Sequence, residues 1–318
     1  MLIGKTLDAV HVDTLEFAPF GRVIVDGWSQ STELAVEDFE LFVDGVASPA
    51  SEFYRVYRPD VRDGGYSERS FTGFVVEFPL GAGAAAAKRE CELRLFGQTL
   101  FRGSVAREPI PVHYDYLLSH DEVEPRDRIY GVGAPLEAIP DEVLRLLDET
   151  VRGGKTLDFG CGRGNLVSTL VARGLDAHGI EIDRPAIRAN VLSHVADRIT
   201  LYDGKFPLPY ADAEFDTVTA IEVIEHVPDF EAAIAEIRRV SRGRFVMTVP
   251  DATAIPRSYA KNVVPWHMLE STHLNFFTLA SATRLLSRHW SRIGTFKLAR
   301  TQVEDVYFHN SIVCVCDD

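Results

Sequence analysis

Long apolar runs are missing from this sequence of 318 residues. No stretch approaches the roughly 18 consecutive apolar residues that a membrane-spanning helix needs, and the first ten residues, MLIGKTLDAV, lack the apolar block of a signal peptide. With 46% hydrophobic residues, the chain is expected to be globular and cytoplasmic. A single core of this size would be near the practical limit, so two domains are expected.

Cysteine and positive charge are also scarce. The four cysteines, at positions 91, 161, 314 and 316, form neither a C-x-x-C pair nor a quartet of metal ligands. This spacing favours buried, reduced thiols in a reducing compartment. Lys and Arg number 33 against 47 Asp and Glu, which gives a net charge of −14. Such an excess of negative charge repels phosphate backbones and disfavours nucleic acid as a partner.

Short alternating segments dominate the first part of the chain. FELFV (39–43) places Phe39, Leu41 and Val43 on one face of a strand. CELRLF (91–96) does the same with its apolar residues at 91, 93 and 95, while Glu92 and Arg94 face away. Turn signals such as Asp44-Gly45 and Arg58-Pro59-Asp60 separate the segments. Six or seven antiparallel strands with almost no helix are expected. We therefore predict an all-β sandwich, an accessory domain over residues 1–118.

The second part of the chain, residues 119–318, alternates predicted strands with predicted helices. After a polar linker at 119–135 and a helix from Ala138, strand-like segments alternate with helical patterns near 164–174, 184–195, 229–241 and 279–290. This alternation predicts an α/β domain with a doubly wound, mostly parallel sheet. The last two predicted strands, near 293–303 and 307–316, have no helix between them, so the final strand is expected to be antiparallel.

A glycine loop opens the α/β domain. In TLDFGCGRGNL, Gly160, Gly162 and Gly164 directly follow an apolar strand and begin a helix. A nicotinamide-binding loop would carry its third glycine at position 165, where this chain has asparagine. Asp158, two residues before the first glycine, suits a ligand with a cationic amino group better than one with phosphates.

Four motifs in order resemble those of class I S-adenosylmethionine-dependent methyltransferases: LDFGCGRG, HGIEID, LYDGKFPLP and FDTVTAIEVIEHVPD. The resemblance covers about residues 130–318 and implies a Rossmann-like sheet. It further implies that Asp158 and the loop Gly160–Cys161–Gly162–Gly164 hold the methionine end of the cofactor. Glu181, beside Ile182, would accept the ribose hydroxyls, and Asp203 with Gly204 would lie beside the adenine. For Asp203, a turn-capping role remains open.

The stretch AIEVIEHVPDF carries two carboxylates and an imidazole within five positions: Glu222, Glu225 and His226. Farther along, VPWHMLESTHLNFFT adds His267, Glu270 and His273. One interpretation is a divalent metal site for Mg²⁺, Mn²⁺ or Zn²⁺, built from Glu222, Glu225, His226 and His273. In the other, no metal is bound, His226 accepts the proton, and Glu222 or Glu225 orients its ring. His273 could close the metal site or act as the base.

The overall resemblance is strongest to bacterial methyltransferases that modify surface or exported polysaccharides, through RIYGVGAP, PWHMLESTHLNFFT and the β-rich module. It implies methyl transfer to a sugar hydroxyl of a glycan or a nucleotide-sugar-type substrate. The E-x-x-E-H motif also resembles ubiquinone-pathway O-methyltransferases and small-RNA terminal 2′-O-methyltransferases. A non-catalytic scaffold that binds the cofactor is a further alternative. For the module, sugar binding and homo-oligomer formation both remain open.

Overall fold

The chain divides into two compact units, Met1–His113 and Tyr114–Asp318. The predicted boundary at residues 118 and 119 and the linker at 119–135 lie outside the described residues. The computed structural model describes residues 9–18, 22–79, 88–106, 139–151, 153–259, 266–270, 272–303 and 306–318. In these ranges, no helix is both long and apolar enough to cross a membrane.

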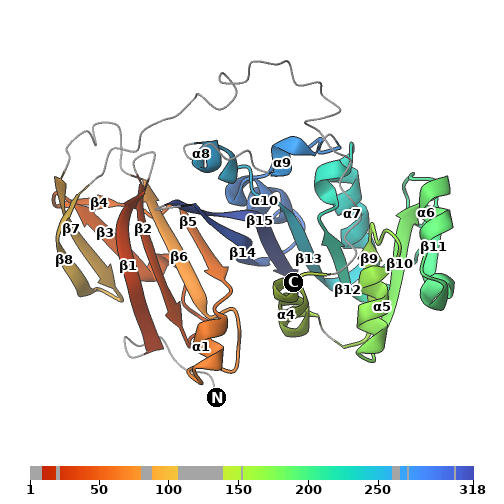
Figure 1. Ribbon diagram of the computed structural model, residues 1–318, viewed down its shortest axis with the longest axis horizontal. Helices are drawn as coiled ribbons and strands as arrows, with labels where there is room; N and C mark the ends of the chain where they lie inside the picture. Colours follow the sequence, from red (N-terminus) through yellow and green to blue (C-terminus); the bar gives the residue numbers. More distant parts are fainter. Residues whose placement is uncertain are drawn as a thin grey trace. The chain divides into compact units, whose positions relative to one another are not determined.

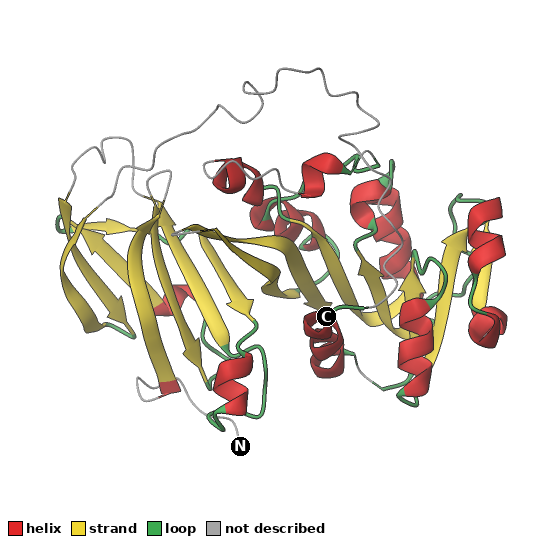
Figure 2. Ribbon diagram, viewed as in Figure 1, coloured by secondary structure: helices red, strands yellow, loops and turns green. Residues whose placement is uncertain are grey.

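Two antiparallel sheets make up the N-terminal unit, which is nearly all strand (Figure 2). The first sheet has the order β1 (Val10–Ala18), β2 (Arg22–Ser29), β6 (Gly73–Pro79), β5 (Glu52–Val56). The second has the order β4 (Val46–Ser48), β3 (Phe39–Val43), β7 (Lys88–Leu95), β8 (Gln98–Ala106). The predicted turn at Arg58-Pro59-Asp60 instead begins a short helix, α1 (Pro59–Asp63), with proline at its first position.

One hydrophobic cluster draws side chains from both of these sheets. Leu41 of β3 and Leu93 of β7 are buried together with Phe74 of β6 and Val25 of β2. As the sequence alternation predicts, β3 shows buried residues at every second position. The period of two in a strand sends alternate side chains to opposite faces, so this pattern turns one face of β3 toward the cluster.

The C-terminal unit contains a mixed seven-stranded sheet (Figure 1). Its order is β14 (Arg292–Val303), β15 (Val306–Asp317), β13 (Ser241–Pro250), β12 (Phe215–Ile221), β9 (Lys155–Phe159), β10 (Asp176–Ile182), β11 (Ile199–Tyr202). Strands β11, β10, β9, β12 and β13 pair in parallel, and β15 runs antiparallel to both β13 and β14. The doubly wound sheet with an antiparallel last strand is confirmed.

Helices cover both faces of this sheet. Figure 1 shows α4 (Asp141–Thr150) and α5 (Asn165–Ala172) on one side, and α7 (Phe230–Val240) and α10 (Leu279–Leu286) on the other. Helix α7 buries Ile234 and Ile237, and the carboxylate of Asp229 caps its first turn by accepting the N–H of Ala232. Apolar residues three apart share one face of a helix, which turns this stripe toward the strands.

The helix predicted at 184–195 is interrupted in the structure. It forms α6 (Pro185–Asn190) and a separate 3-10 turn at Ser193–Arg198. Val191 between them leaves the helical region with ψ of 133°, and the N–H of Leu192 donates to the carbonyl of Arg163 at 3.0 Å. This bond ties the segment to the glycine loop. The sequence also gave no signal for the short helices α8 (Ala254–Tyr259) and α9 (Trp266–Leu269).

Candidate active site

The candidate site lies at the carboxyl ends of the parallel strands of the C-terminal unit. Strand β9 ends at Phe159, directly before the glycine loop, and the neighbouring β12 ends at Ile221, directly before Glu222. Because parallel strands end at one edge of a sheet, these two segments lie together. In open α/β sheets this edge is where ligands bind.

The glycine loop makes a tight turn that residues with a Cβ atom would form only with backbone strain. Gly160, Gly162 and Gly164 all have positive φ, at 76°, 55° and 91°. A Cβ atom added at Gly160 would lie 2.5 Å from Cγ1 of Val223, so the loop backbone passes close to the segment after β12. Cys161 is buried, with its sulfur over Gly179. Glycine permits this path because it adopts positive φ without steric cost.

Asp158 is almost fully buried at the end of β9 and lines a cavity beside this loop. The hydroxyl of Thr219 donates to its Oδ1 at 2.9 Å. The pKa of Asp158 is raised to about 7, mainly by burial and to a lesser extent by the nearby carboxylate of Glu181, while the hydrogen bond from Thr219 lowers it. A bound cationic amino group would stabilise the ionised form.

Glu181 and Asp203, predicted to contact the cofactor, have different surroundings. The carboxylate of Glu181, next to Ile182, accepts two backbone N–H groups at 2.8 Å, from Gly162 and Ile182. Each carboxylate oxygen keeps a free lone pair for a hydroxyl. Asp203 is exposed, and its carboxylate contacts the backbone N–H and the ammonium group of Lys205, both at 3.1 Å. Gly204 follows with φ of 80°, and this arrangement resembles a turn cap.

A cavity of about 560 Å³ brings the glycine loop and the acid–histidine cluster together. Its size is typical of small-molecule sites, which measure about 300–1,000 Å³. Segments far apart in the sequence form its wall: the start of α4, the glycine loop, the end of β12, and residues of β13, β14 and β15. Among the described lining residues are Asp158, Gly160, Cys161, Gly162, Arg163, Glu222, Glu225, His226, Glu270, Thr272, His273 and Ser311.

Glu222 enters this cavity from a strained backbone. Its φ is +53°, a region that residues with a Cβ rarely adopt, and its N–H donates to the carbonyl and the hydroxyl of Thr248. Burial raises the pKa of Glu222 to about 7, although hydrogen bonds from Thr248 and Ser311 favour the ionised form. A carboxyl group with this pKa can accept a proton near neutral pH.

Glu225 is fully buried, and neither of its carboxylate oxygens has a hydrogen-bond partner among the described residues. Burial raises its pKa well above the usual value, and the charge of Glu222 raises it further. Two imidazoles face it: Nε2 of His226 lies 3.7 Å and Nε2 of His273 lies 4.0 Å from its Oε1. One ligand atom from each of these three residues lies within 4.8 Å of the other two.

Hydrogen bonds to backbone carbonyls orient both rings. Nδ1 of His226 contacts the carbonyl oxygen of Thr272, and Nδ1 of His273 contacts that of His267, both at 3.1 Å. Because a carbonyl can only accept, the proton of each ring is assigned to Nδ1. In the neutral rings, both Nε2 lone pairs then point toward Glu225. Burial lowers the pKa of His273, which favours its neutral form.

This donor set fits a divalent cation. Three acceptor groups that face one another repel unless a cation or a proton lies between them. The distances of 3.7 and 4.0 Å exceed hydrogen-bond length. They are close to the separation of about 3.4 Å between two ligands of a tetrahedral ion with metal–ligand bonds of about 2.1 Å. The carbonyls behind Nδ1 of each ring are the outer partners that metal-binding histidines use. Glu222 lies outside the converging group.

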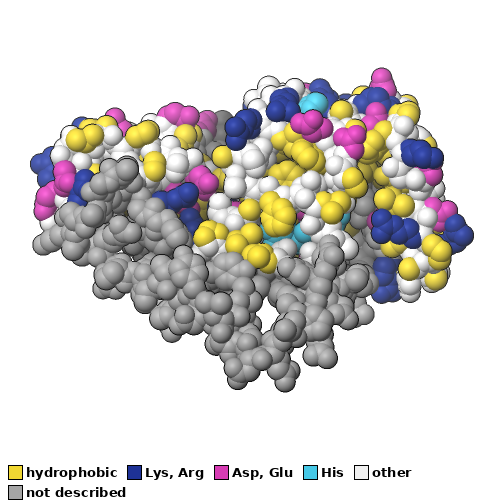
Figure 3. Space-filling model, turned by 90° about the horizontal axis from the view of Figure 1, so that it is seen from above, with side chains coloured by type: hydrophobic (Ala, Val, Ile, Leu, Met, Phe, Trp, Pro, Cys, Tyr) yellow, Lys and Arg dark blue, Asp and Glu magenta, His cyan; other side chains and the backbone are white. Residues whose placement is uncertain are grey.

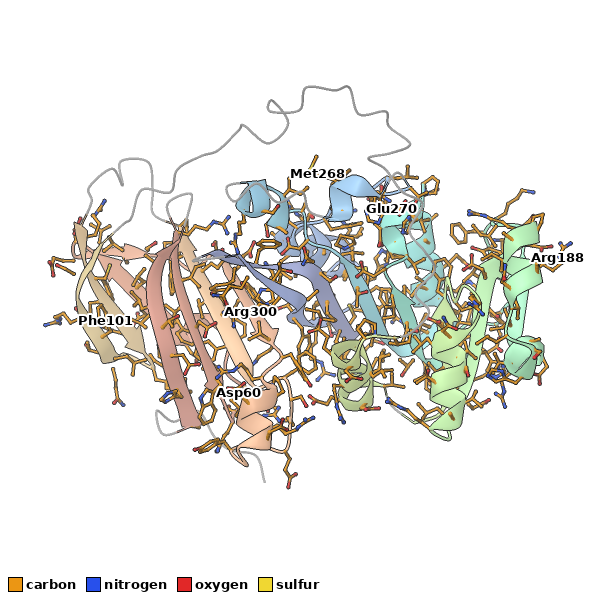
Figure 4. The ribbon with its side chains drawn as sticks, viewed as in Figure 1. Asp60, Phe101, Arg188, Met268, Glu270 and Arg300 are labelled. Atoms are coloured by element: carbon orange, nitrogen blue, oxygen red, sulfur yellow. The ribbon has the colours of Figure 1, made fainter. Side chains whose placement is uncertain are left out.

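One segment, residues 266–273, supplies these outer partners and two residues that the sequence prediction left out of the site. Nδ1 of His267 lies 2.5 Å from Nδ1 of His273, and burial lowers the pKa of His267 to about 4. Glu270, labelled in Figure 4, accepts the hydroxyl proton of Thr272, whose oxygen lies 2.9 Å from Nδ1 of His226. The polar residues that cluster in the sequence around His273 could have indicated that His267 and Glu270 also belong to the site.

Apolar side chains border this segment. Leu274 and Phe276 are 54% and 56% exposed, and the ring of Phe276 lies 4.5 Å from that of His267. Seen from above, histidine side chains lie beside hydrophobic ones on this face of the C-terminal unit (Figure 3). Large exposed apolar groups next to a cavity are typical of ligand-binding surfaces.

Comparison with known proteins agrees with this geometry. Residues 133–289 match a family model described as a methyltransferase domain. The chain is 34% identical over 130 residues to an uncharacterized methyltransferase of Mycobacterium sp. (strain KMS), covering 40% of this chain and 51% of that protein. It is 33% identical over 112 residues to a ubiquinone biosynthesis O-methyltransferase of Thiobacillus denitrificans, covering 33% of this chain and 48% of that protein.

Two further similarities extend the comparison. A 27-O-demethylrifamycin SV methyltransferase of Amycolatopsis mediterranei is 34% identical over 110 residues, covering 33% of this chain and 40% of that protein. A solved SAM-dependent methyltransferase from Archaeoglobus fulgidus superposes with a TM-score of 0.46 at 13% identity, covering 56% of this chain and 92% of that chain. The chain spans about half the length, or less, of the curated relatives it matches. Residues 133–289 thus form a class I S-adenosylmethionine-dependent methyltransferase domain.

Proposed function

We propose that this protein is an O-methyltransferase that uses S-adenosylmethionine. The observation that carries the proposal is the single cavity lined both by the glycine loop with Asp158 and by the cluster of Glu222, Glu225, His226 and His273. S-adenosylmethionine supplies a methyl group on a sulfonium whose departure leaves a neutral thioether, so the leaving group needs no acid. The protein's remaining tasks are to hold the acceptor in line and to take its proton.

The roles that we propose for the cofactor-binding residues are those that the resemblance implies, and the positions of these residues support them. Asp158 would bind the amino group of the methionine end, and Glu181 would accept the ribose hydroxyls while holding Gly162 of the loop. Gly160, Cys161, Gly162 and Gly164 shape the loop. Asp203, with Gly204, would border the adenine, although its carboxylate already contacts Lys205.

Two groups would prepare the acceptor hydroxyl. Glu222, whose pKa of about 7 lies at neutrality, would accept its proton. Glu225, His226 and His273 would hold a divalent metal, Mg²⁺, Mn²⁺ or Zn²⁺. A metal there would lower the pKa of a bound hydroxyl. With two imidazoles and one carboxylate, the set suits Mn²⁺ or Zn²⁺ better than Mg²⁺, which prefers oxygen ligands.

As acceptor we propose a sugar hydroxyl of a glycan or a nucleotide-sugar-type substrate. Two relatives are named as O-methyltransferases, which supports oxygen as the acceptor atom. The net charge of −14 and the five carboxyl groups lining the cavity oppose an RNA substrate. We further propose that residues 1 to about 118 are a β-sandwich accessory domain, and that the enzyme works in the cytoplasm, in keeping with its four buried free thiols.

A phenol or quinol acceptor is the second candidate. The exposed side chains of Leu274 and Phe276 beside His267 favour it, because they would pack against an apolar ring. The test is a screen of methyl transfer from labelled S-adenosylmethionine to nucleotide sugars, oligosaccharides, catechols and short RNAs. Transfer to a saccharide supports the first proposal, and transfer only to catechols supports the second. Absence of transfer to any hydroxyl, with the cofactor bound, would instead indicate a non-catalytic scaffold.

A further inference from the structure

The turn after β12, which carries Glu225 and His226, is bonded to one short segment after α9. The carbonyl of Glu225 accepts two backbone N–H groups of that segment, from Leu274 at 2.8 Å and from Asn275 at 3.0 Å. In the other direction, Nδ1 of His226 contacts the carbonyl oxygen of Thr272 at 3.1 Å. The two segments that supply the three converging side chains are therefore joined directly.

The side chain of Asn275 adds two further bonds to the same turn. Its Nδ2 lies 3.0 Å from the carbonyl oxygen of Ile224 and 2.8 Å from that of Val227. Because carbonyls can only accept, the NH₂ group of the amide is assigned to this position, and each of its two protons has a partner. The two carbonyls flank Glu225 and His226, so one side chain holds the turn at both ends.

Hydrogen bonding, and not the burial of apolar surface, orients this segment. Leu274 and Phe276 are 54% and 56% exposed, whereas Asn275 between them is half-buried. The hydrophobic effect alone would favour the opposite arrangement, with the two apolar side chains turned inward. The bonds of Asn275 to the turn compensate for this, which indicates that the contact with the turn is the task of the residue.

We propose that Asn275 is a positioning residue, which holds the turn after β12 so that Glu225 and His226 face the metal. The inference rests on the proposed function and deepens it. His273 lies two residues before Asn275, so one segment would both supply the third ligand and hold the other two in place.

Such a clamp is needed because the ligand-free arrangement is unfavourable by itself. The carboxylate of Glu225 is fully buried, and among the described residues neither of its oxygens has a hydrogen-bond partner. Burying a polar group without a partner costs free energy. A turn without its outer bonds would relax and carry Glu225 toward water or toward a donor, and the three ligands would no longer be arranged before the metal arrives.

The experiment measures three quantities on the full chain: the affinity for Zn²⁺, the affinity for S-adenosylhomocysteine and the melting temperature. In Asn275→Ala the dissociation constant of Zn²⁺ should rise about 10- to 100-fold, the loss typical of groups that orient metal ligands. Asn275→Leu keeps the size of the side chain but has no donor, and it should show the same loss. The affinity for S-adenosylhomocysteine should change little, because Glu181 and the glycine loop lie on other segments.

Asn310→Ala is the matched control. Nδ2 of Asn310 also makes two hydrogen bonds, to the carbonyl oxygen of Ala299 at 3.0 Å and to the hydroxyl oxygen of Thr301 at 2.8 Å. Its loss should lower the melting temperature about as much as Asn275→Ala does. A merely structural role of Asn275 predicts equal Zn²⁺ affinity in the two alanine variants, whereas positioning predicts that the Zn²⁺ affinity falls only in the Asn275 variants.

The inference is overturned if Asn275→Ala or Asn275→Leu binds Zn²⁺ as tightly as the wild type, or if Asn310→Ala loses as much Zn²⁺ affinity as Asn275→Ala. The wild type would still bind both ligands in these cases, so the proposed function would stand. If the wild type binds S-adenosylhomocysteine but no Zn²⁺, the proposed metal site fails and the inference fails with it.

Discussion

His226 and His273 point their Nε2 atoms at the same buried oxygen, Oε1 of Glu225, from 3.7 and 4.0 Å. The two rings come from positions 47 residues apart in the chain, one in the turn after β12 and the other in the segment after α9. Each ring has its Nδ1 fixed by a backbone carbonyl of residues 267–272. Three groups thus converge without mutual hydrogen bonds, and a cation between them would balance the arrangement.

Removal of one imidazole should strongly weaken metal binding. We expect the full chain to bind one Mn²⁺ or Zn²⁺ ion. Loss of an outer hydrogen-bond partner of a metal ligand lowers metal affinity about 10- to 100-fold, and His273→Ala, which removes a ligand itself, should lower the affinity by more than this. The matched control is His194→Ala, which removes an exposed imidazole bonded to Ser168 in the same domain. Calorimetry at neutral pH measures both. Equal affinity in His273→Ala and wild type, or full methyl transfer after dialysis against EDTA, would contradict the metal site.

Glu222 should set the acidic limb of the pH profile. A base must be deprotonated, so kcat/KM should fall as the pH drops below the Glu222 pKa of about 7. Glu222→Gln should lower the rate about 10²- to 10⁴-fold and remove this limb. Cofactor affinity, measured separately, should change little. A limb near pH 7 that persists in Glu222→Gln would assign the base to another group, with His226 the first candidate.

The order of strands and helices in the C-terminal unit, and the segments that supply the site residues, could be predicted from the sequence. The glycine spacing and the acid at each strand end predicted where Asp158, Glu181 and Glu222 lie along the sheet, because strand ends in a parallel sheet share one edge. The sequence could not show that Glu225, His226 and His273 converge without Glu222. Glu222 has a positive φ and contacts Thr248 and Ser311, which come from other strands.

The outer partners of the histidines were equally beyond sequence reasoning. The bonds that orient His226 and His273 are made by backbone carbonyls, and every residue has one, so no residue type marks them. The N–H of Gly162, which donates to the carboxylate of Glu181, is also a backbone group that no residue type marks. Such contacts depend on how the chain folds around the site.

Glu181→Ala should weaken cofactor binding through two lost functions. The carboxylate would no longer accept the ribose hydroxyls, and the N–H of Gly162 would lose its acceptor, so the loop itself would loosen. We expect S-adenosylhomocysteine to bind at least about 10- to 100-fold more weakly, as for one charged hydrogen bond. The control is Asp183→Ala, two residues away, which removes an acid paired with Arg188 on the exposed side. Unchanged affinity in Glu181→Ala would remove this residue from the site.

Asp158→Asn should stabilise the ligand-free protein and weaken cofactor binding. Burial raises the pKa of Asp158 from 3.8 to about 7, so between these values the folded state binds more protons than the unfolded state. The stability from this group is complete below pH 4 and is lost as the pH rises through 7. An amide carries no charge to desolvate and can still accept the hydroxyl proton of Thr219. At pH 8, the ligand-free variant should therefore unfold at a higher temperature, by about 2–4 °C for each kcal/mol gained.

The same variant should lose the acid that binds the cofactor's amino group, at a cost of about 10- to 100-fold in affinity. Asp148→Asn, an exposed acid that pairs with Arg173, is the matched control and should change neither quantity strongly. Thermal unfolding between pH 5 and 8, with and without S-adenosylhomocysteine, measures both effects on one sample. If the difference in melting temperature between the wild type and Asp158→Asn did not change between pH 5 and 8, Asp158 would be ionised in the empty site throughout this range, and the acid would then need a cationic partner from the protein itself.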